Sequence, residues 1–301
     1  MKYPHCGYKG LRKRGSYSET SPRYMKDGDP YMAKVRILVV PNHVKSAALR
    51  AAQHLEKMDY DTVFLNFSRD LEEGVRAIAE GAPYDYVIER LKELKLIPEP
   101  VGAWEYSAEP ILMALRGILH KKLNVEIHCY RDSSFDLLST KTAEKIALLI
   151  FRTCSIEKID AEEWRTLLNS LLEPEAKALK EETDFITRKA ESSEDGICIA
   201  GFNGRHIGTR LEDEGYDVSL TYLYVPYHFT PLEILMREMR RAAARGASLS
   251  YEKITKLVKH HAQFIRGYVT VSEDYDEAYR KWVCDKAPWL MSASRMSGIG
   301  Q

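Results

Sequence analysis

Two histidines stand where hydrophobic, β-rich runs of the sequence end. His43 follows the run 35–40, and His206 follows the run 196–201. Imidazole changes its charge near neutral pH and is the commonest metal ligand in proteins, so this pair suits proton transfer or the binding of a divalent ion. Each histidine alone could instead complete a loop or a helix end, and the argument for function rests on the pair.

Polar and charged residues also follow two other runs. Asn66 lies at the end of the run 62–67, and Arg131 and Asp132 follow the run 125–130. In open parallel sheets ligands bind beyond the carboxyl ends of the strands, so we expect these side chains and the two histidines to line one crevice. A small-molecule ligand is the expected partner. The cofactor stays open, with a divalent metal ion held by the two histidines as one alternative.

Short β-rich runs alternate with longer amphipathic segments from residue 35 onward. This alternation predicts an α/β fold with a mainly parallel sheet flanked by helices. Helical spacing over 140–153 and 161–192 predicts an inserted pair of helices, interrupted at Pro174. The expected strands are 35–40, 62–67, 125–130, 196–201 and 218–225, and the other expected helices are 45–57, 71–81, 84–94, 109–119 and 207–214.

The chain divides into three expected parts. Residues 1–31 are basic, have no apolar signal-peptide region and are expected to form a flexible tail. Residues 32–230 are expected to form the α/β core, with the helical insertion at about 140–192, and residues 231–301 a helical region packed on that core.

Composition excludes several classes of protein. Lys plus Arg and Asp plus Glu number 44 each, so the whole molecule has no net field that would gather nucleic acid or acidic lipid. No apolar run reaches the roughly 18 residues of a membrane span, so we expect no membrane partner. The five cysteines form no CxxC pair and leave one over in any complete disulfide set, which favours a reducing, cytoplasmic location.

The segment 237–266 is the main basic feature outside the tail. It contains eight Lys or Arg residues and two Asp or Glu residues within an expected helical region. Such a patch could bind nucleic acid or a nucleotide locally, and a steep salt dependence of oligonucleotide binding would support that alternative. The oligomeric state is not indicated by any of these patterns.

Six short segments between residues 33 and 230 follow one another in an order that resembles the TraB/ChaN/erythromycin-esterase-like superfamily. The segments are VVPNHVKSA, TVFLNFSRD, AWEYSAEPILMAL, VEIHCYRDS, EETDFITRKA and ICIAGFNGRHIGTRLEDEGYDV. The chain is identified as a divergent member of that superfamily. The resemblance implies a hydrolase-like enzyme that acts on a small ester, amide or phosphoester, with metal assistance in one alternative.

The resemblance carries over onto His43, Glu105, Asp132, Asp184 and His206. A histidine would take a proton from water, and the carboxylates would orient the second histidine or an ion. Glu109 lies one helical turn beyond Glu105 and shares its face. Together with the polar strand ends, the candidates are His43, Glu105, Asp132 and His206 for catalysis, and Asn66, Glu109, Arg131, Asp184 and Arg205 for substrate binding.

The chain also departs from the superfamily pattern at three positions. Val40 and Asn203 stand where a glycine usually precedes each histidine by three residues, and Asn66 stands where a glutamate is usual. An asparagine can neither take a proton nor neutralise a metal ion, so the chemistry of relatives is expected to be altered here. The alternatives are therefore a catalytically inactive ligand-binding or interaction protein on the same fold, or the nucleic-acid-binding protein described above.

Overall fold

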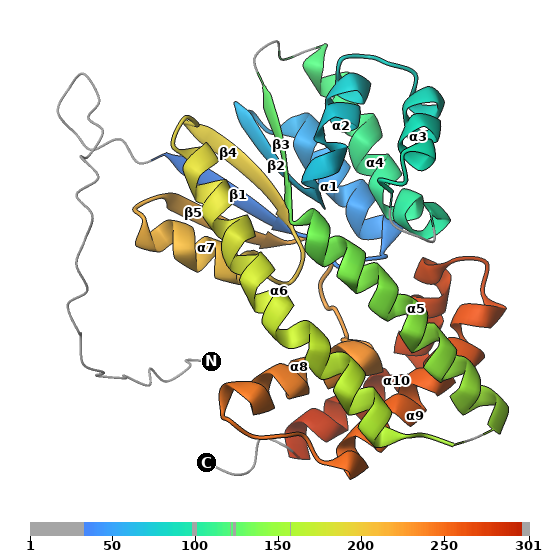
Figure 1. The fold of residues 1–301 in the computed structure, drawn as a ribbon. Coiled ribbons are helices and arrows are strands. Elements are labelled where there is room, and N and C mark those ends of the chain that lie inside the picture. The colour runs from blue at the N-terminus through green and yellow to red at the C-terminus, as the bar shows by residue number, and fades with distance from the viewer. Residues whose placement is uncertain (1–32, 98–100, 121, 123–124, 157, 297–301) are drawn as a thin grey trace, which may run out of the picture. The chain divides into compact units, whose positions relative to one another are not determined.

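Five parallel strands form one sheet in the order β3-β2-β4-β1-β5 (Figure 1). The structure is a computed structural model that describes residues 33–97, 101–120, 122, 125–156 and 158–296. The predicted α/β class with a parallel sheet is confirmed, whereas the expected tail, residues 1–31, lies outside the described residues. The strands are β1 (Lys34–Val39), β2 (Thr62–Ser68), β3 (Glu126–Arg131), β4 (Asp195–Ala200) and β5 (Asp217–Tyr222).

The central strands are buried on both faces, as their continuous apolar sequences require. In β1, Ile37 pairs with Cys198 of β4 on one side and with Leu220 of β5 on the other. Cys129 in β3 and Cys198 in β4 are fully buried free thiols, as expected for small apolar core residues. β5 is shorter than predicted, because the chain leaves the sheet after Tyr222.

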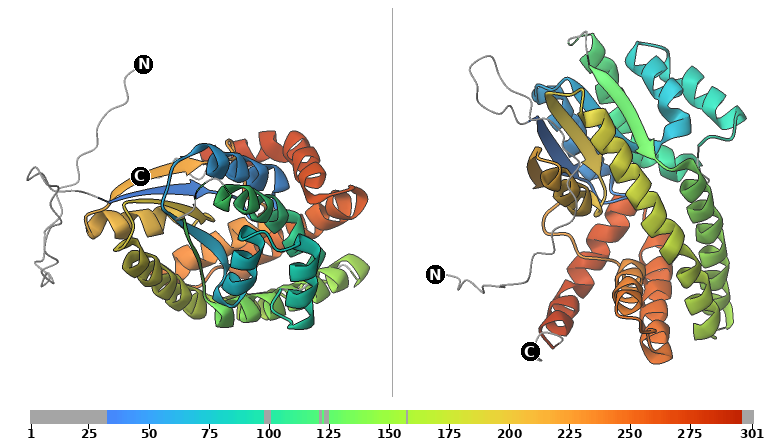
Figure 2. Two further views of the ribbon diagram at one scale, coloured as in Figure 1. Left: turned by 90° about the horizontal axis from the view of Figure 1, so that it is seen from above. Right: turned by 60° about the vertical axis from the view of Figure 1, so that its left-hand side comes forward.

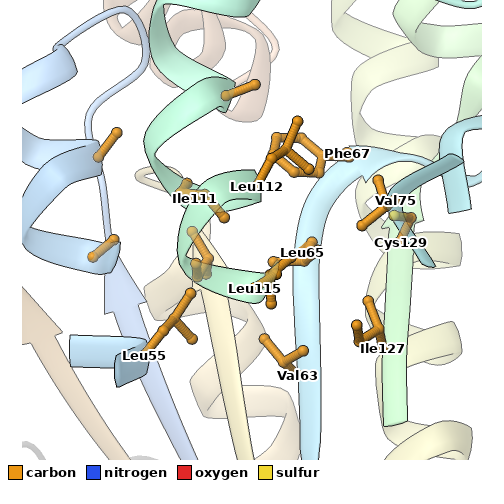
Figure 3. Packing of buried hydrophobic residues seen from close by; sticks show 14 of the residues in the cluster. Leu55, Val63, Leu65, Phe67, Val75, Ile111, Leu112, Leu115, Ile127 and Cys129 are labelled. Carbon is orange, nitrogen blue, oxygen red and sulfur yellow. The ribbon is translucent and has the colours of Figure 1, made fainter. Parts of the chain in front are cut away.

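Three helices cover one face of the sheet, and a fourth packs on their outer side (Figure 1). They enclose a core in which Leu55 and Leu115 lie close to Val63 and Leu65 of β2 (Figure 3). A short 3-10 turn, Arg69–Leu71, leads from β2 into this layer. The helices are α1 (Lys45–Lys57), α2 (Glu72–Ala79), α3 (Tyr84–Glu93) and α4 (Val101–Leu119), the last beginning earlier than predicted. The outer helix is α3, which packs against α2.

Two further helices cover the opposite face, and a third lies beside them. Ile186 and Ile207 pack there against Ile37 and Phe64 of the sheet. These helices are α5 (Ser133–Ile156), α6 (Ala161–Ala190) and α7 (Gly204–Asp213). Because the crossovers from β1 and β2 use one face and those from β3 and β4 the other, the sheet is covered on both sides.

The predicted interruption at Pro174 is wrong, because α6 continues through it. Proline removes one helical hydrogen bond and crowds the preceding turn. The residues on either side are nevertheless held in place, since Leu168, Leu171 and Ala178 are all buried. Tertiary packing therefore outweighs the local cost of the proline.

A layer of three helices completes the described chain. The helices are α8 (Pro231–Ala244), α9 (Tyr251–Gly267) and α10 (Tyr275–Met296), with a 3-10 turn at Val269–Val271. Figure 2 shows α8 and α9 beside the long helices α5 and α6, and Leu235 and Val258 share a core there with Leu149 and Trp164. No helix within the described ranges is long and apolar enough to cross a membrane.

Candidate functional site

At the carboxyl ends of the neighbouring strands β1 and β4, the chain leaves the sheet toward opposite faces. The helix that follows β1 covers one face of the sheet, and the helix that follows β4 covers the other. In open parallel sheets a ligand crevice forms at such a point, beyond the carboxyl ends of the two strands. His43 and His206 follow these two neighbouring strands, so the sheet order supports the prediction that both histidines lie at one edge.

His43 lies in the turn between β1 and α1 and has a left-handed backbone, with φ of 66°. This conformation is uncommon for a residue other than glycine, although histidine, asparagine and aspartate accept it more readily than others. His43 keeps part of its surface in solvent, and its ring lies edge-on to that of Tyr275 at a centroid distance of 6.0 Å. The protein around the ring desolvates it and lowers the pKa of His43, so the neutral imidazole is favoured at neutral pH.

The first turn of α1 is capped by a residue from the far end of the chain. Val44, at the N-cap position, makes no side-chain hydrogen bond to the helix. Instead, the Asp276 carboxylate accepts hydrogen bonds from the backbone N–H groups of Lys45 and Ser46, each at 2.8 Å. A carboxylate at a helix N-terminus satisfies free amides and complements the helix dipole.

The loops after β1 and β4 meet at Gly201. A Cβ atom on Gly201 would lie 3.6 Å from Asn42 Oδ1 and 3.5 Å from Asn203 Oδ1, so both amide groups border this glycine. Asn42 is exposed, as is His206 in the first turn of α7. The two amides therefore lie together where the loops after β1 and β4 meet, and the two histidines follow these loops, His43 in the turn before α1 and His206 in the first turn of α7.

Arg131 and Asp132 lie at a second place on the same edge, beyond β2 and β3. Arg131 forms an ion pair with Asp136 at 2.5 Å. The backbone N–H of Asp132 donates to Glu182 Oε1 of α6 at 3.1 Å, and Asp132 Oδ1 accepts from Phe135 N at 2.7 Å. Asp132 therefore caps α5 and joins a buried network of charged groups.

Burial shapes the electrostatics of this second place. Desolvation raises the pKa of Asp136 and of Glu182, although Arg131 opposes both shifts. Burial would also lower the pKa of Arg131, but its attraction to Asp136 and Glu182 prevails, and the pKa is raised. The guanidinium of Arg69 lies 4.7 Å from the Phe185 ring, and its buried Nε and Nη2 have no hydrogen-bond partner among the described residues.

The two places are separated by a split in the sheet. β2 pairs with β4 only as far as Phe64 and Cys198. The hydroxyl of Tyr130, a fully buried residue of β3, donates to the Ile199 carbonyl of β4 at 3.0 Å. Three strand steps separate β3 from β1, which corresponds to roughly 14 Å at 4.8 Å per step.

Glu105 and Glu109 lie one turn apart on α4 but pair with different helices. Glu105 Oε1 accepts a hydrogen bond from the Tyr84 hydroxyl at 3.3 Å, and Glu105 Oε2 lies 3.7 Å from Lys92 Nζ, both partners on α3. Glu109 Oε2 lies 3.1 Å from Lys45 Nζ on α1. Glu109 thus connects α4 to α1, the helix that follows His43, whereas Glu105 connects α4 to α3.

The remaining candidates make fewer contacts. Asn66 is half-buried in β2, Asp184 is half-buried on α6, and Arg205 is exposed on α7. Within the described ranges, no hydrogen bond or ion pair joins any two of the four catalytic candidates, and no three metal-binding side chains gather. A pocket shared by all four therefore stays a prediction.

Tyr275 and Asp276 are contacts of the His43 turn that sequence reasoning missed. The superfamily resemblance covers residues 33–230 only and gives no reason to look at α10. An Asp in the first turn of a helix normally complements its own helix dipole, so its sequence position conceals a role at α1. Only the folded chain brings α10 to this turn.

The fold and this edge define an α/β protein with exposed polar residues beyond the carboxyl ends of β1 and β4. Comparison of the chain with models of protein families, with curated proteins and with solved structures gives no match. The functional argument therefore depends on the geometry of the described residues.

Proposed function

We propose that the protein is a hydrolase that uses His43 as a proton-transfer residue on a small ester, amide or phosphoester. The observation that carries the proposal is the left-handed backbone of His43 at a sharp strand-to-helix turn. Strained residues concentrate at active sites, where the surrounding structure holds them in place. Some α/β hydrolases present a catalytic side chain above the sheet on a turn of this kind.

The chemistry follows from the protonation state and the neighbours of His43. Its lowered pKa favours the neutral form, which can accept a proton from an attacking water molecule. His206, in the first turn of α7 after the adjacent strand, is assigned to the leaving group. The side-chain N–H groups of Asn42 and Asn203, whose Oδ1 atoms both border Gly201, are assigned as donors to the oxygen on which negative charge develops.

The test is a panel of small esters, amides and phosphoesters assayed with the wild type and two glycine variants. His43→Gly removes the imidazole but accepts the left-handed backbone, and Lys95→Gly is its matched control because Lys95 is exposed and also has a positive φ, 56°. We expect His43→Gly to lose about 10²- to 10⁴-fold in kcat/KM and Lys95→Gly to retain activity. Equal activity of all three proteins on every hydrolysed substrate would exclude His43 from the reaction.

The nucleic-acid alternative receives less support from the ion pairs of the basic segment. Arg240 forms two hydrogen bonds with Glu175 at 2.7 and 2.6 Å. Arg241 and Lys253 both pair with Glu238. These contacts neutralise part of the basic surface that phosphate binding would need.

The proposed location is a reducing compartment, the cytoplasm. Burial raises the pKa of Cys129 and of Cys198, which keeps both thiols protonated and unreactive. Free cysteines in a chain without a predicted disulfide framework fit such a compartment.

A further inference from the structure

We propose that Tyr275 and Asp276, the first two residues of α10, are positioning residues that hold the His43 turn in its left-handed conformation. The inference rests on the proposed function of His43. It makes the C-terminal helical region part of the site, rather than a layer that only adds stability. The two residues act on different sides of the turn, one through the backbone and one through the imidazole ring.

Asp276 acts through the backbone directly after His43. Both of its carboxylate oxygens are used, Oδ1 by Lys45 N and Oδ2 by Ser46 N. These are the first two amides of α1, and the local sequence provides no other cap because Val44 occupies that position. Because both amides are held, the direction in which α1 leaves β1 is fixed. The backbone of His43, the strained residue between β1 and α1, is therefore fixed as well.

Tyr275 acts on the imidazole itself. Its ring lies 6.0 Å from that of His43, with an angle of 62° between the two planes. Tyr275 is held in turn by aromatic neighbours, with ring distances of 6.2 Å to Phe264 of α9 and 6.5 Å to Tyr279 of α10. The edge of a fixed ring limits the rotation of His43, which keeps its nitrogen atoms directed toward a reacting group.

The same contacts explain how the turn tolerates its backbone. A residue other than glycine keeps a strained backbone conformation only where contacts with the surrounding structure offset the cost of the strain. The Asp276 cap and the Tyr275 ring supply that constraint from a segment more than 200 residues away in the chain. Without them, we expect His43 to leave the left-handed region and to become more mobile.

The first experiment compares Asp276→Ala with Asp160→Ala in the full chain. Asp160 is a matched control, because Asp160 Oδ1 accepts from Glu162 N and Glu163 N, each at 3.0 Å, at the start of α6. Both variants thus remove a carboxylate that caps a helix. The readout is the chemical shift and line width of the His43 ring resonances in nuclear magnetic resonance spectra, assigned with His43→Gly, together with the hydrogen exchange of the Lys45 and Ser46 amides.

The comparison of these two variants separates loosening of the His43 turn from the general loss of a helix cap. We expect Asp276→Ala to shift and broaden the His43 ring resonances and to reduce the hydrogen-exchange protection of Lys45 N and Ser46 N, because both amides lose their acceptor. Asp160→Ala should leave the His43 resonances and these two amides unchanged. Unchanged His43 resonances in a folded Asp276→Ala protein overturn the proposal.

The second experiment compares Tyr275→Phe with Tyr275→Leu. Phenylalanine keeps the ring that meets His43, whereas leucine removes it, so only Tyr275→Leu should broaden or shift the His43 resonances. On a substrate found with the panel, Tyr275→Leu and Asp276→Ala should each lose on the order of 10- to 100-fold in kcat/KM, while Tyr275→Phe retains activity. Equal effects of phenylalanine and leucine, or a gain in activity in either test variant, would contradict positioning by the ring.

The two readouts keep this inference separate from the proposed function. Displaced His43 resonances in a protein that hydrolyses no substrate would support positioning and reject the hydrolase. Hydrolysis that depends on His43 but is unaffected by Asp276→Ala would support the hydrolase and reject positioning.

Discussion

The two places along the carboxyl edge of the sheet differ in how their charged and polar groups are used. Beyond β2 and β3, Arg131, Asp136 and Glu182 are largely buried and interact mainly with one another. Beyond β1 and β4, His43 and Asn42 reach solvent from a turn that the rest of the structure holds in place. A strand end rich in charged groups is therefore not by itself a site, since groups that pair with one another inside the protein are not available to a ligand.

The largest expected effect is that of Arg131→Ala at the β2–β3 end. This variant leaves the partly buried Asp136 and the buried Glu182 without their nearest positive charge, and removing one partner of a fully buried ion pair costs about 3–5 kcal/mol, which sets the upper end of the expected loss. Urea denaturation at neutral pH would measure the loss. The control is Arg205→Ala, an exposed arginine of α7, which should change the free energy of unfolding by less than about 0.5 kcal/mol. Similar small losses in both variants would mean that the β2–β3 network does not hold the fold.

Relative to wild type, Arg131→Ala should lose less free energy of unfolding in acid than at neutral pH. The folded-state pKa values of Asp136 and Glu182 already lie above their ordinary values, and loss of Arg131 removes an opposing attraction. A carboxyl whose pKa is raised on folding binds a proton more tightly when folded, so stability increases as the pH falls through that pKa. Denaturation curves at neutral pH and near pH 5 should show a smaller difference from wild type at the lower pH. A difference that grows in acid would reverse the assigned sign.

Gly204→Ala tests how closely α7 must approach the β1–β4 end. An added Cβ would lie 3.0 Å from Val39 Cγ2 and 3.1 Å from Ile37 Cγ2, which is too close without movement. Overpacking of this kind costs about 1–3 kcal/mol, measured by thermal or chemical unfolding. Gly102→Ala is the control, because nothing lies within 4 Å of its added Cβ. If Gly204→Ala is as stable as the control, the contact between α7 and β1 is softer than the structure indicates.

The smallest expected effect is that of changing His43 itself. His43→Asn should alter the free energy of unfolding by less than about 0.5 kcal/mol, since the side chain is exposed and asparagine accepts a positive φ. His43→Val should cost about 1–2 kcal/mol more, because a β-branched residue is strained in this conformation. Equal stability of the two variants, measured by urea denaturation, would show that the turn relaxes easily and is not held.

Elements with strong local patterns were predictable from the sequence. The helix expected at residues 45–57 has those bounds in α1, and the expected strand starts at Val35, Thr62 and Val125 fall within one residue of β1, β2 and β3. Apolar periodicity predicts such segments well, because a helix must bury one apolar stripe and a central strand must bury both of its faces. The predicted interruption at Pro174 is wrong because the sequence shows only the local cost of the proline, whereas the packing that offsets it comes from other elements.

The candidate site was predictable only in part, for the same reason. The sequence shows which residues follow the strands, and the parallel pairing of β1 with β4 directs both strand ends toward one edge. Three contacts depend on the folded chain: the Tyr130 hydroxyl bonds to β4 beside a split in the sheet, Arg131 forms an ion pair with Asp136, and Asp276 caps α1. Local propensity depends on neighbours along the chain, but burial, ion pairing and capping between distant segments depend on which surfaces meet when the chain folds.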